Sequence, residues 1–326
     1  MNFSSTLLRA LVAAALAVLL AACGGQSQVA FNPGRILVFG DQASVITDTG
    51  RKYTVNALAA DGTIDCVANP IWVQVFASSY GMVFPQCVGT ATTTTPASRI
   101  LAQPGALANG TSDSDLVGQI TLQLELPVSD GGGISSSDLV TVYIGTNDVV
   151  AAYAASLAGA GLADVQAQVD AAGITIANQL ARIASAGGKV MFVTVPDVGL
   201  TPFGRAQDLA GTALLTALTL RLNNTLLLQL NNSGNNNGRE IGLIEINPIL
   251  VNVMANPAAY SYVDVLDAAC VPTDPLLCTT DTLTTNPDGS AAGSFTWLWA
   301  SDLQFSPGGH LQLGNLAASR AHSQPF

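Results

Sequence analysis

The sequence predicts an α/β protein with a mostly parallel central sheet and helices on both faces. Short apolar segments with strand character recur along the chain at residues 36–39, 138–144, 189–195 and 241–246. Helix-length segments separate the last three of them. Strands that alternate with helices in this way are typical of a parallel sheet covered on both sides. In such sheets ligands bind beyond the carboxyl ends of the strands, so the turns after these segments form the candidate site.

Four segments are expected to form helices because each has a helical length and ends at glycine or polar residues. They cover residues 149–158, 163–186, 209–230 and 311–320. A further strand is expected near residues 100–103, where Pro104 leaves the local register open.

The composition indicates one acidic globular domain. The 326 residues are 49% hydrophobic and include 11 Lys+Arg against 22 Asp+Glu, which gives a formal net charge of -11. Nucleic acid is excluded as a partner because phosphate binding needs a basic patch, and the few cations here are scattered. No charged or proline-rich linker divides residues 35–326, so we expect them to form a single domain and the protein to be a monomer.

The N-terminus has the pattern of a targeting segment. Arg9 precedes an apolar run that ends in L-A-A-C at Cys23, which resembles a bacterial lipobox. This predicts a lipoprotein signal peptide over residues 1–22, lipid on Cys23 and a short tether over residues 23–34. Gly24 favours sorting of the exported, lipid-anchored protein to the outer membrane. The alternative is an ordinary signal peptide with an incidental cysteine.

Export makes the other four cysteines interpretable, because an oxidising periplasm favours disulfides. The pairing that is most local in sequence joins Cys66 to Cys87 and Cys270 to Cys278, and it is one of three possible connectivities. The chain has no Cys-x-x-Cys motif, and its only histidines are His310 and His322. We therefore expect neither a metal site nor a cofactor.

Polar residues follow three of the predicted strands, at Gly40-Asp41, at residues 145–148 and at Pro196-Asp197. The turns should meet at one edge of the sheet. An ester-hydrolysing site could be built there from a nucleophile after the first strand, an amide after a middle strand, and an acid with a base before the last helix. Asp302 is the candidate acid in that order.

Five motifs in this order resemble the SGNH hydrolases of the GDSL lipase and esterase type, and most of all their lipoprotein branch in Gram-negative bacteria. They are V-F-G-D at 38–41, I-G-T-N-D at 144–148, V-P-D-V-G-L-T-P-F-G at 195–204, N-P-A-A-Y at 256–260, and Asp302 ahead of the last helix. Together they span essentially the whole mature chain.

The resemblance implies a flavodoxin-like three-layer sandwich with an esterase site at one edge. In that family a serine after Gly-Asp attacks the ester, and its backbone amide, a loop glycine and an asparagine hold the oxyanion. The base is a histidine three residues after an aspartate. Matched to this sequence, the oxyanion groups are Gly105 and Asn147 and the acid is Asp302. The serine position holds Gln42 and the histidine position holds Phe305.

These two replacements predict that catalysis is impaired or lost. A glutamine amide is not a usable nucleophile, and a phenylalanine ring cannot take a proton. Losing either group of a triad lowers the rate by a factor on the order of 10⁴ to 10⁶. We therefore expect a silent lipoprotein that keeps the crevice for an acyl ester, lipid, glycan or protein partner.

The alternative is an active ester hydrolase that uses rearranged residues, with Ser44 as nucleophile and His310 as base. The competing interpretation of Ser44 is a serine that caps its own helix, and that of His310 is a partly exposed residue of a first helical turn. Asp41 is expected to cap or brace the turn, and the aromatic residues Phe295, Trp297 and Trp299 to pack near Asp302.

Overall fold

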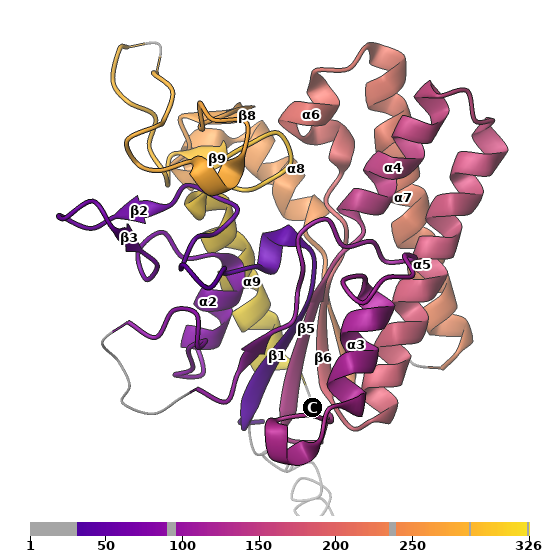
Figure 1. Ribbon diagram of the computed structural model, residues 1–326. Helices are drawn as coiled ribbons and strands as arrows, with labels where there is room; N and C mark the ends of the chain where they lie inside the picture. The colour runs from indigo at the N-terminus through magenta and orange to yellow at the C-terminus, as the bar shows by residue number, and fades with distance from the viewer. Residues whose placement is uncertain (1–30, 90–95, 235–238, 287, 325) are drawn as a thin grey trace, which may run out of the picture. The chain divides into compact units, whose positions relative to one another are not determined.

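The computed structural model describes residues 31–89, 96–234, 239–286, 288–324 and 326 (Figure 1). Asn32–Gln324 and Phe326 form one compact unit, which is the part of the chain described below. The predicted signal peptide, the predicted lipidation site Cys23 and most of the predicted tether lie outside the described residues. In the described residues no helix combines the length and the hydropathy that a membrane span requires.

Five strands form the central sheet in the order β4-β1-β5-β6-β7, and every neighbouring pair is parallel (Figure 1). They are β1 (Arg35–Gly40), β4 (Arg99–Ile100), β5 (Asp138–Tyr143), β6 (Lys189–Val193) and β7 (Ile241–Ile244). The register pairs Gly40 with Tyr143 and Tyr143 with Val193. The carboxyl ends of β1, β5 and β6 therefore lie at one level, and this confirms the predicted parallel sheet.

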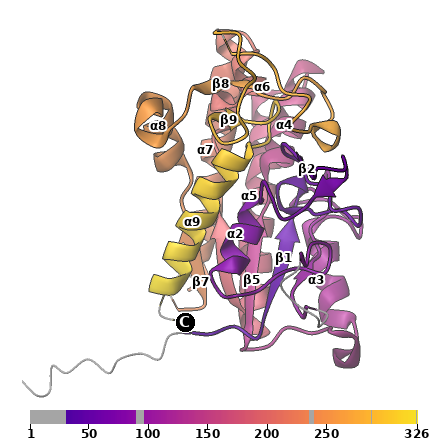
Figure 2. The same ribbon diagram turned by 90° about the vertical axis from the view of Figure 1, so that its left-hand side faces the viewer.

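Helices cover both faces of the sheet, as predicted (Figures 1 and 2). One face carries α3 (Leu116–Glu125), α4 (Thr146–Leu157), α5 (Leu162–Ser185) and α7 (Leu209–Asn232), and the other carries α2 (Trp72–Ser78) and α9 (Pro307–Ser323). Leu37 and Phe39 pack in the core with α3, α4, α5 and α7. Because side chains alternate along a strand, Ile36 and Val38 face the opposite layer.

Smaller elements surround the carboxyl edge of the sheet (Figure 1). Two short helices follow β6 and β7, namely α6 (Pro202–Arg205) and α8 (Asn247–Ala255). Two small sheets pair β2 (Ala57–Leu58) with β3 (Ile64–Asp65) and β8 (Asp264–Ala268) with β9 (Trp297–Trp299). Single-turn 3₁₀ helices in this region are η1 (Gln42–Ser44), η3 (Val198–Leu200), η4 (Pro257–Tyr260) and η5 (Pro275–Leu277). A further one, η2 (Val128–Asp130), lies at the amino end of β1, where Arg35 donates to the backbone oxygen of Gly131.

Both predicted disulfides are present in the structure. Cys66 bonds to Cys87 and Cys270 bonds to Cys278, which confirms the local pairing. The first closes the segment that contains α2, and the second closes the loop that contains η5. Cys66 directly follows β3, so the first disulfide joins the end of the β2–β3 hairpin to the segment after α2.

Two helices begin earlier than the sequence predicted. Helix α4 starts at Thr146, so Asn147 belongs to its first turn. Helix α9 starts at Pro307, and the Ser306 hydroxyl caps it by accepting from the Gly309 amide at 3.3 Å. Proline at the first helical position and serine just before it are favourable start signals, although the glycines that follow obscured them in the sequence.

Candidate functional site

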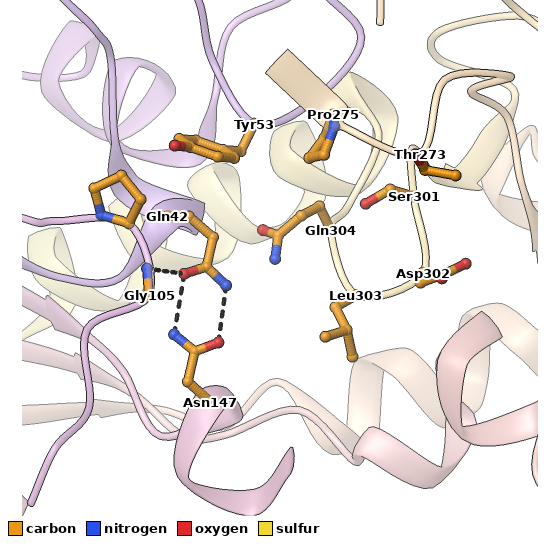
Figure 3. Close-up of a pocket in the computed structure, with 11 residues that line it drawn as sticks. Gln42, Tyr53, Gly105, Asn147, Thr273, Pro275, Ser301, Asp302, Leu303 and Gln304 are labelled. Atoms are coloured by element: carbon orange, nitrogen blue, oxygen red, sulfur yellow. Dashed lines mark hydrogen bonds between the residues drawn. The ribbon is translucent and has the colours of Figure 1, made fainter. Parts of the chain in front are cut away.

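A pocket of about 310 Å³ opens beyond the carboxyl ends of the sheet strands (Figure 3). It is lined by Gln42, Tyr53, Pro104, Gly105, Asn147, Thr273, Pro275, Ser301, Asp302, Leu303 and Gln304. Four residues predicted to form the site therefore share one pocket, namely Gln42, Gly105, Asn147 and Asp302. The lining also includes Gln304 and Ser301, which the sequence analysis did not identify as site residues.

The turn that carries Gln42 is fixed from both sides. Gly40 has a φ of 139°, and a Cβ added there would lie 2.1 Å from the backbone oxygen of Tyr143, so only glycine fits. Asp41 caps η1, as expected, by accepting from the Ala43 amide at 3.0 Å. The Gln42 side chain is thereby directed from the end of β1 into the pocket (Figure 3).

The Gln42 side chain is hydrogen-bonded to Gly105 and Asn147, the two groups that the resemblance assigned to the oxyanion hole. Its Oε1 accepts from the Gly105 backbone amide at 3.0 Å and from Asn147 Nδ2 at 3.0 Å (Figure 3). Its Nε2 donates back to Asn147 Oδ1 at 3.1 Å. The second hydrogen of Asn147 Nδ2 goes to the backbone oxygen of Ala106 at 2.9 Å. A carbonyl oxygen of the protein itself thus sits where a substrate oxygen would need these donors.

Two buried carboxyls brace this arrangement from behind the pocket. Asp148 accepts from the Ala108 amide at 2.9 Å and from the Asn109 amide at 3.3 Å, which ties α4 to the loop that contains Gly105. Burial raises the pKa of Asp148 to about 6. Burial also raises the pKa of Asp41 to about 7, and the nearby charge of Asp148 adds to that effect. Neither carboxyl lines the pocket, so both are supporting residues.

The structure places Phe305 outside the pocket, contrary to its predicted base position. Its ring is buried and stacks on Trp299, with ring centroids 4.7 Å apart and an interplanar angle of 11°. Hydrophobic burial accounts for this orientation, because the inward ring packs on Trp299 and an outward ring would be exposed to solvent. Trp297 and Trp299 are buried as expected, whereas Phe295 is 45% exposed.

Gln304 points into the pocket in place of Phe305 (Figure 3). The loop over residues 300–304 is closed by the Ala300 amide, which donates to the backbone oxygen of Gln304 at 2.8 Å. Gln304 lies three residues after Ser301, which also lines the pocket. This is the spacing that the family has between its aspartate and its histidine. Ser301 and Gln304 therefore have the same spacing as that motif, although not its residue types. They lie one residue before Asp302 and Phe305, which have this spacing as well.

The two residues of the rearranged alternative lie beneath the pocket, around Trp72. Ser44 Oγ accepts from Trp72 Nε1 at 3.1 Å, and His310 Nδ1 accepts from the Trp72 backbone amide at 3.3 Å. Ser44 thus does not cap its own helix, since Asp41 does so. The expectation of a partly exposed His310 is wrong, because its side chain is fully buried. Neither residue is among the described residues that line the pocket.

The surroundings of His310 keep its ring neutral. Burial, together with the smaller effect of the positive charge of Lys52, lowers the pKa of His310 to about 3. Lys52 is itself buried and donates from Nζ to the backbone oxygens of Cys66, Ala68 and Asn69 at 2.8 to 2.9 Å. His310 Nε2 has no hydrogen-bond partner among the described residues. Within those residues no cluster of His, Cys, Asp or Glu side chains has the grouping that a metal ion needs.

The fold is an α/β fold with a parallel central sheet, and its pocket lies beyond the carboxyl ends of the strands. A family model described as GDSL-like Lipase/Acylhydrolase matches residues 36–292, and the chain therefore belongs to this family. The match ends before Ser301, so it does not align the segment where the family places its base. Comparison with curated protein sequences finds no significant match.

Solved structures with a similar fold include an alpha/beta hydrolase and two esterases. An alpha/beta hydrolase from the metagenome of Lake Arreo, Spain, is 12% identical with a TM-score of 0.45, over 91% of this chain and 98% of that one. The acetylxylan esterase Axe2 of Geobacillus stearothermophilus is 13% identical with a TM-score of 0.45, over 90% and 96%. The M. smegmatis aryl esterase is 14% identical with a TM-score of 0.41, over 89% and 99%. These similarities concern the chain fold alone.

Proposed function

We propose that this member of the GDSL-like family does not hydrolyse esters and instead binds a ligand in the pocket lined by Gln42 and Gln304. The observation that carries the proposal is the position of the Gln42 amide. Its oxygen takes the hydrogen bonds of Gly105 and Asn147, so an ester carbonyl meets an occupied site. Stabilising a developing oxyanion through these donors requires Gln42 to leave them first.

The pocket also lacks the groups for a covalent step. Gln42 and Gln304 are neutral amides, which neither attack an ester nor accept a proton near neutral pH. Ser301 and Thr273 carry hydroxyls in the pocket, but no histidine is among the described residues that line it. A serine without a base loses a factor on the order of 10⁴ to 10⁶ in rate, and the residual rate then depends on an oxyanion hole. Here Gln42 occupies that hole, so this residual contribution is also removed.

The proposal includes export and a lipid anchor on Cys23 in the outer membrane of a Gram-negative bacterium, with the protein acting as a monomer. The L-A-A-C sequence before Gly24 and the two disulfides support this location. Gly34 leads into the amino end of β1, where its amide donates to the backbone oxygen of Ser137. The amino end of β1 is the opposite end of the strand from the pocket, and this supports a ligand that comes from outside the anchoring membrane.

The test is ester turnover by the full-length protein. A short-chain aryl ester is offered with and without a fluorophosphonate, which labels activated serines. We expect hydrolysis at the rate of buffer alone and no labelled serine. The rearranged-enzyme alternative predicts turnover and labelling at Ser44, both absent in Ser44→Ala. That result would overturn the proposal.

A further inference from the structure

Gln304 is a buried amide that lines the pocket, and its acceptor oxygen is buried without a hydrogen-bond partner among the described residues. Its side chain is only 6% exposed, and Oε1 accepts no hydrogen bond from the described residues. The amide is directed toward Gln42 and lies below the ring of Tyr53 (Figure 3). A buried acceptor without a partner is unfavourable. If the Gln304 side chain turns its oxygen toward the pocket, a ligand that donates to it removes that penalty.

The charge of the pocket argues for a neutral ligand. None of the described residues that line it is lysine or arginine, and Asp302 places a carboxylate at its exposed side. The whole chain carries a formal net charge of -11. A carboxylate or phosphate ligand would meet repulsion here without a cation to offset it.

The polar groups argue for a ligand rich in hydroxyls. The amides of Gln42 and Gln304 and the hydroxyls of Ser301 and Thr273 can each both donate and accept. A sugar hydroxyl has the same double capacity, whereas an acyl chain leaves these groups without partners. Beside them, the half-buried ring of Tyr53 gives a flat apolar surface at the pocket rim (Figure 3). The C–H face of a pyranose ring can pack on such a surface.

We infer that the pocket binds a neutral saccharide, with a sugar hydroxyl donating to Gln304 Oε1 and a sugar ring lying on Tyr53. This inference deepens the proposed function and rests on it. Gln42 keeps its bonds to Gly105 and Asn147 in the complex and offers the second hydrogen of Nε2 to the ligand.

Calorimetric titration of the full-length protein tests the inference. The probes are three neutral trisaccharides (xylotriose, maltotriose and N-acetylchitotriose), the anion trigalacturonate, and methyl octanoate as an acyl probe. We expect saturable binding of at least one neutral trisaccharide and weaker or no binding of trigalacturonate. Binding of methyl octanoate without any neutral trisaccharide would overturn the inference while leaving the proposed function intact. Hydrolysis of methyl octanoate would instead contradict the proposed function.

Variants locate the binding. Gln304→Leu keeps the size of the side chain and removes the amide, and we expect it to weaken the trisaccharide roughly tenfold. Gln168→Leu is the matched control, because Gln168 is exposed on α5 and does not line the pocket. Tyr53→Leu changes a half-buried rim residue, so it tests the site even if Gln304→Leu fails to fold. It should weaken binding severalfold. Unchanged affinity in both pocket variants would place the saccharide elsewhere and overturn the inference.

Discussion

The side-chain oxygen of Gln42 accepts from Asn147 Nδ2 at 3.0 Å, and the Gln42 amide donates back to Asn147 Oδ1 at 3.1 Å. The pair joins the end of β1 to the first turn of α4 across 105 residues of sequence. The residue that replaces the family serine is thus bonded to the residue that the family uses to hold an oxyanion. The replacing side chain therefore takes the hydrogen bonds that a substrate oxygen would need.

Removing this bond should cost a modest amount of stability. Gln42→Ala leaves the Gly105 amide and the Asn147 side chain without their shared acceptor. Both groups remain near solvent, so the expected loss in the free energy of unfolding is about 1 kcal/mol. Urea denaturation of Gln42→Ala measures it, with Gln168→Ala on the exposed face of α5 as the control. A loss in Gln42→Ala no larger than in the control would show that the bond contributes nothing to the folded state.

Acidification should destabilise the protein through His310. Its pKa is about 3 when folded and 6.5 in its ordinary state, so below pH 6.5 the unfolded chain takes up a proton that the folded chain does not. Stability from the neutral ring is present above pH 6.5 and is lost as the pH falls toward 3. Between pH 7 and pH 5 the loss from this group is about 2 kcal/mol.

The contribution of His310 is isolated by comparing the unfolding free energy of the wild-type protein with that of a variant without the ring. Asp41 and Asp148 act in the opposite direction, because their pKa values are raised to about 7 and about 6. Their contribution to the free energy of unfolding is lost as the pH rises. His310→Gln keeps these two carboxyls and removes the titrating ring. Urea denaturation of both proteins at pH 5, 6 and 7 gives the difference curve. A flat difference would mean that His310 titrates alike in both states.

The Cys66–Cys87 disulfide should contribute more stability than the Cys270–Cys278 disulfide. The two close loops with sequence separations of 21 and 8 residues. A disulfide lowers the entropy of the unfolded chain and so stabilises the folded protein. The expected contribution is about 3 kcal/mol for the longer loop and somewhat less for the shorter one. Paired Cys→Ser variants, compared by thermal unfolding, measure the order. The opposite order would indicate that local packing, and not chain constraint, dominates.

The sequence predicted the layers of this fold better than the details of the site. Runs of branched and aromatic residues that end at turns predicted β1, β5, β6 and β7. Strands that are buried on both faces consist of such residues. The start of α4 was misplaced because Gly145-Thr146-Asn147 reads as a loop. The bond of Gln42 to Asn147 could not be foreseen, since it depends on the register of β1 and β5.

The position of the family's base is one such detail of the site that the sequence did not predict correctly. Counting from Asp302 leads to Phe305, and counting from Ser301 leads to Gln304. Only the closed loop over residues 300–304 decides which side chain points inward. An aromatic residue favours burial against Trp299, and this preference was available in the sequence as an argument against Phe305 at a pocket.

Restoration of a triad tests the central claim most directly. The triple variant Gln42→Ser, Ser301→Asp, Gln304→His frees Gly105 and Asn147 and supplies nucleophile, acid and base in the pocket. The base adds a factor of at least about 100 over Gln42→Ser alone. Gln42→Ser with Phe305→His is the control, because residue 305 faces Trp299.

The measurement is hydrolysis of a short-chain aryl ester by the wild-type protein, the triple variant and the control side by side. We predict buffer-level hydrolysis by the wild-type protein and the control, and turnover with fluorophosphonate labelling in the triple variant. Enzymatic turnover by the wild-type protein would contradict the account, as would equal activity in the control and the triple variant.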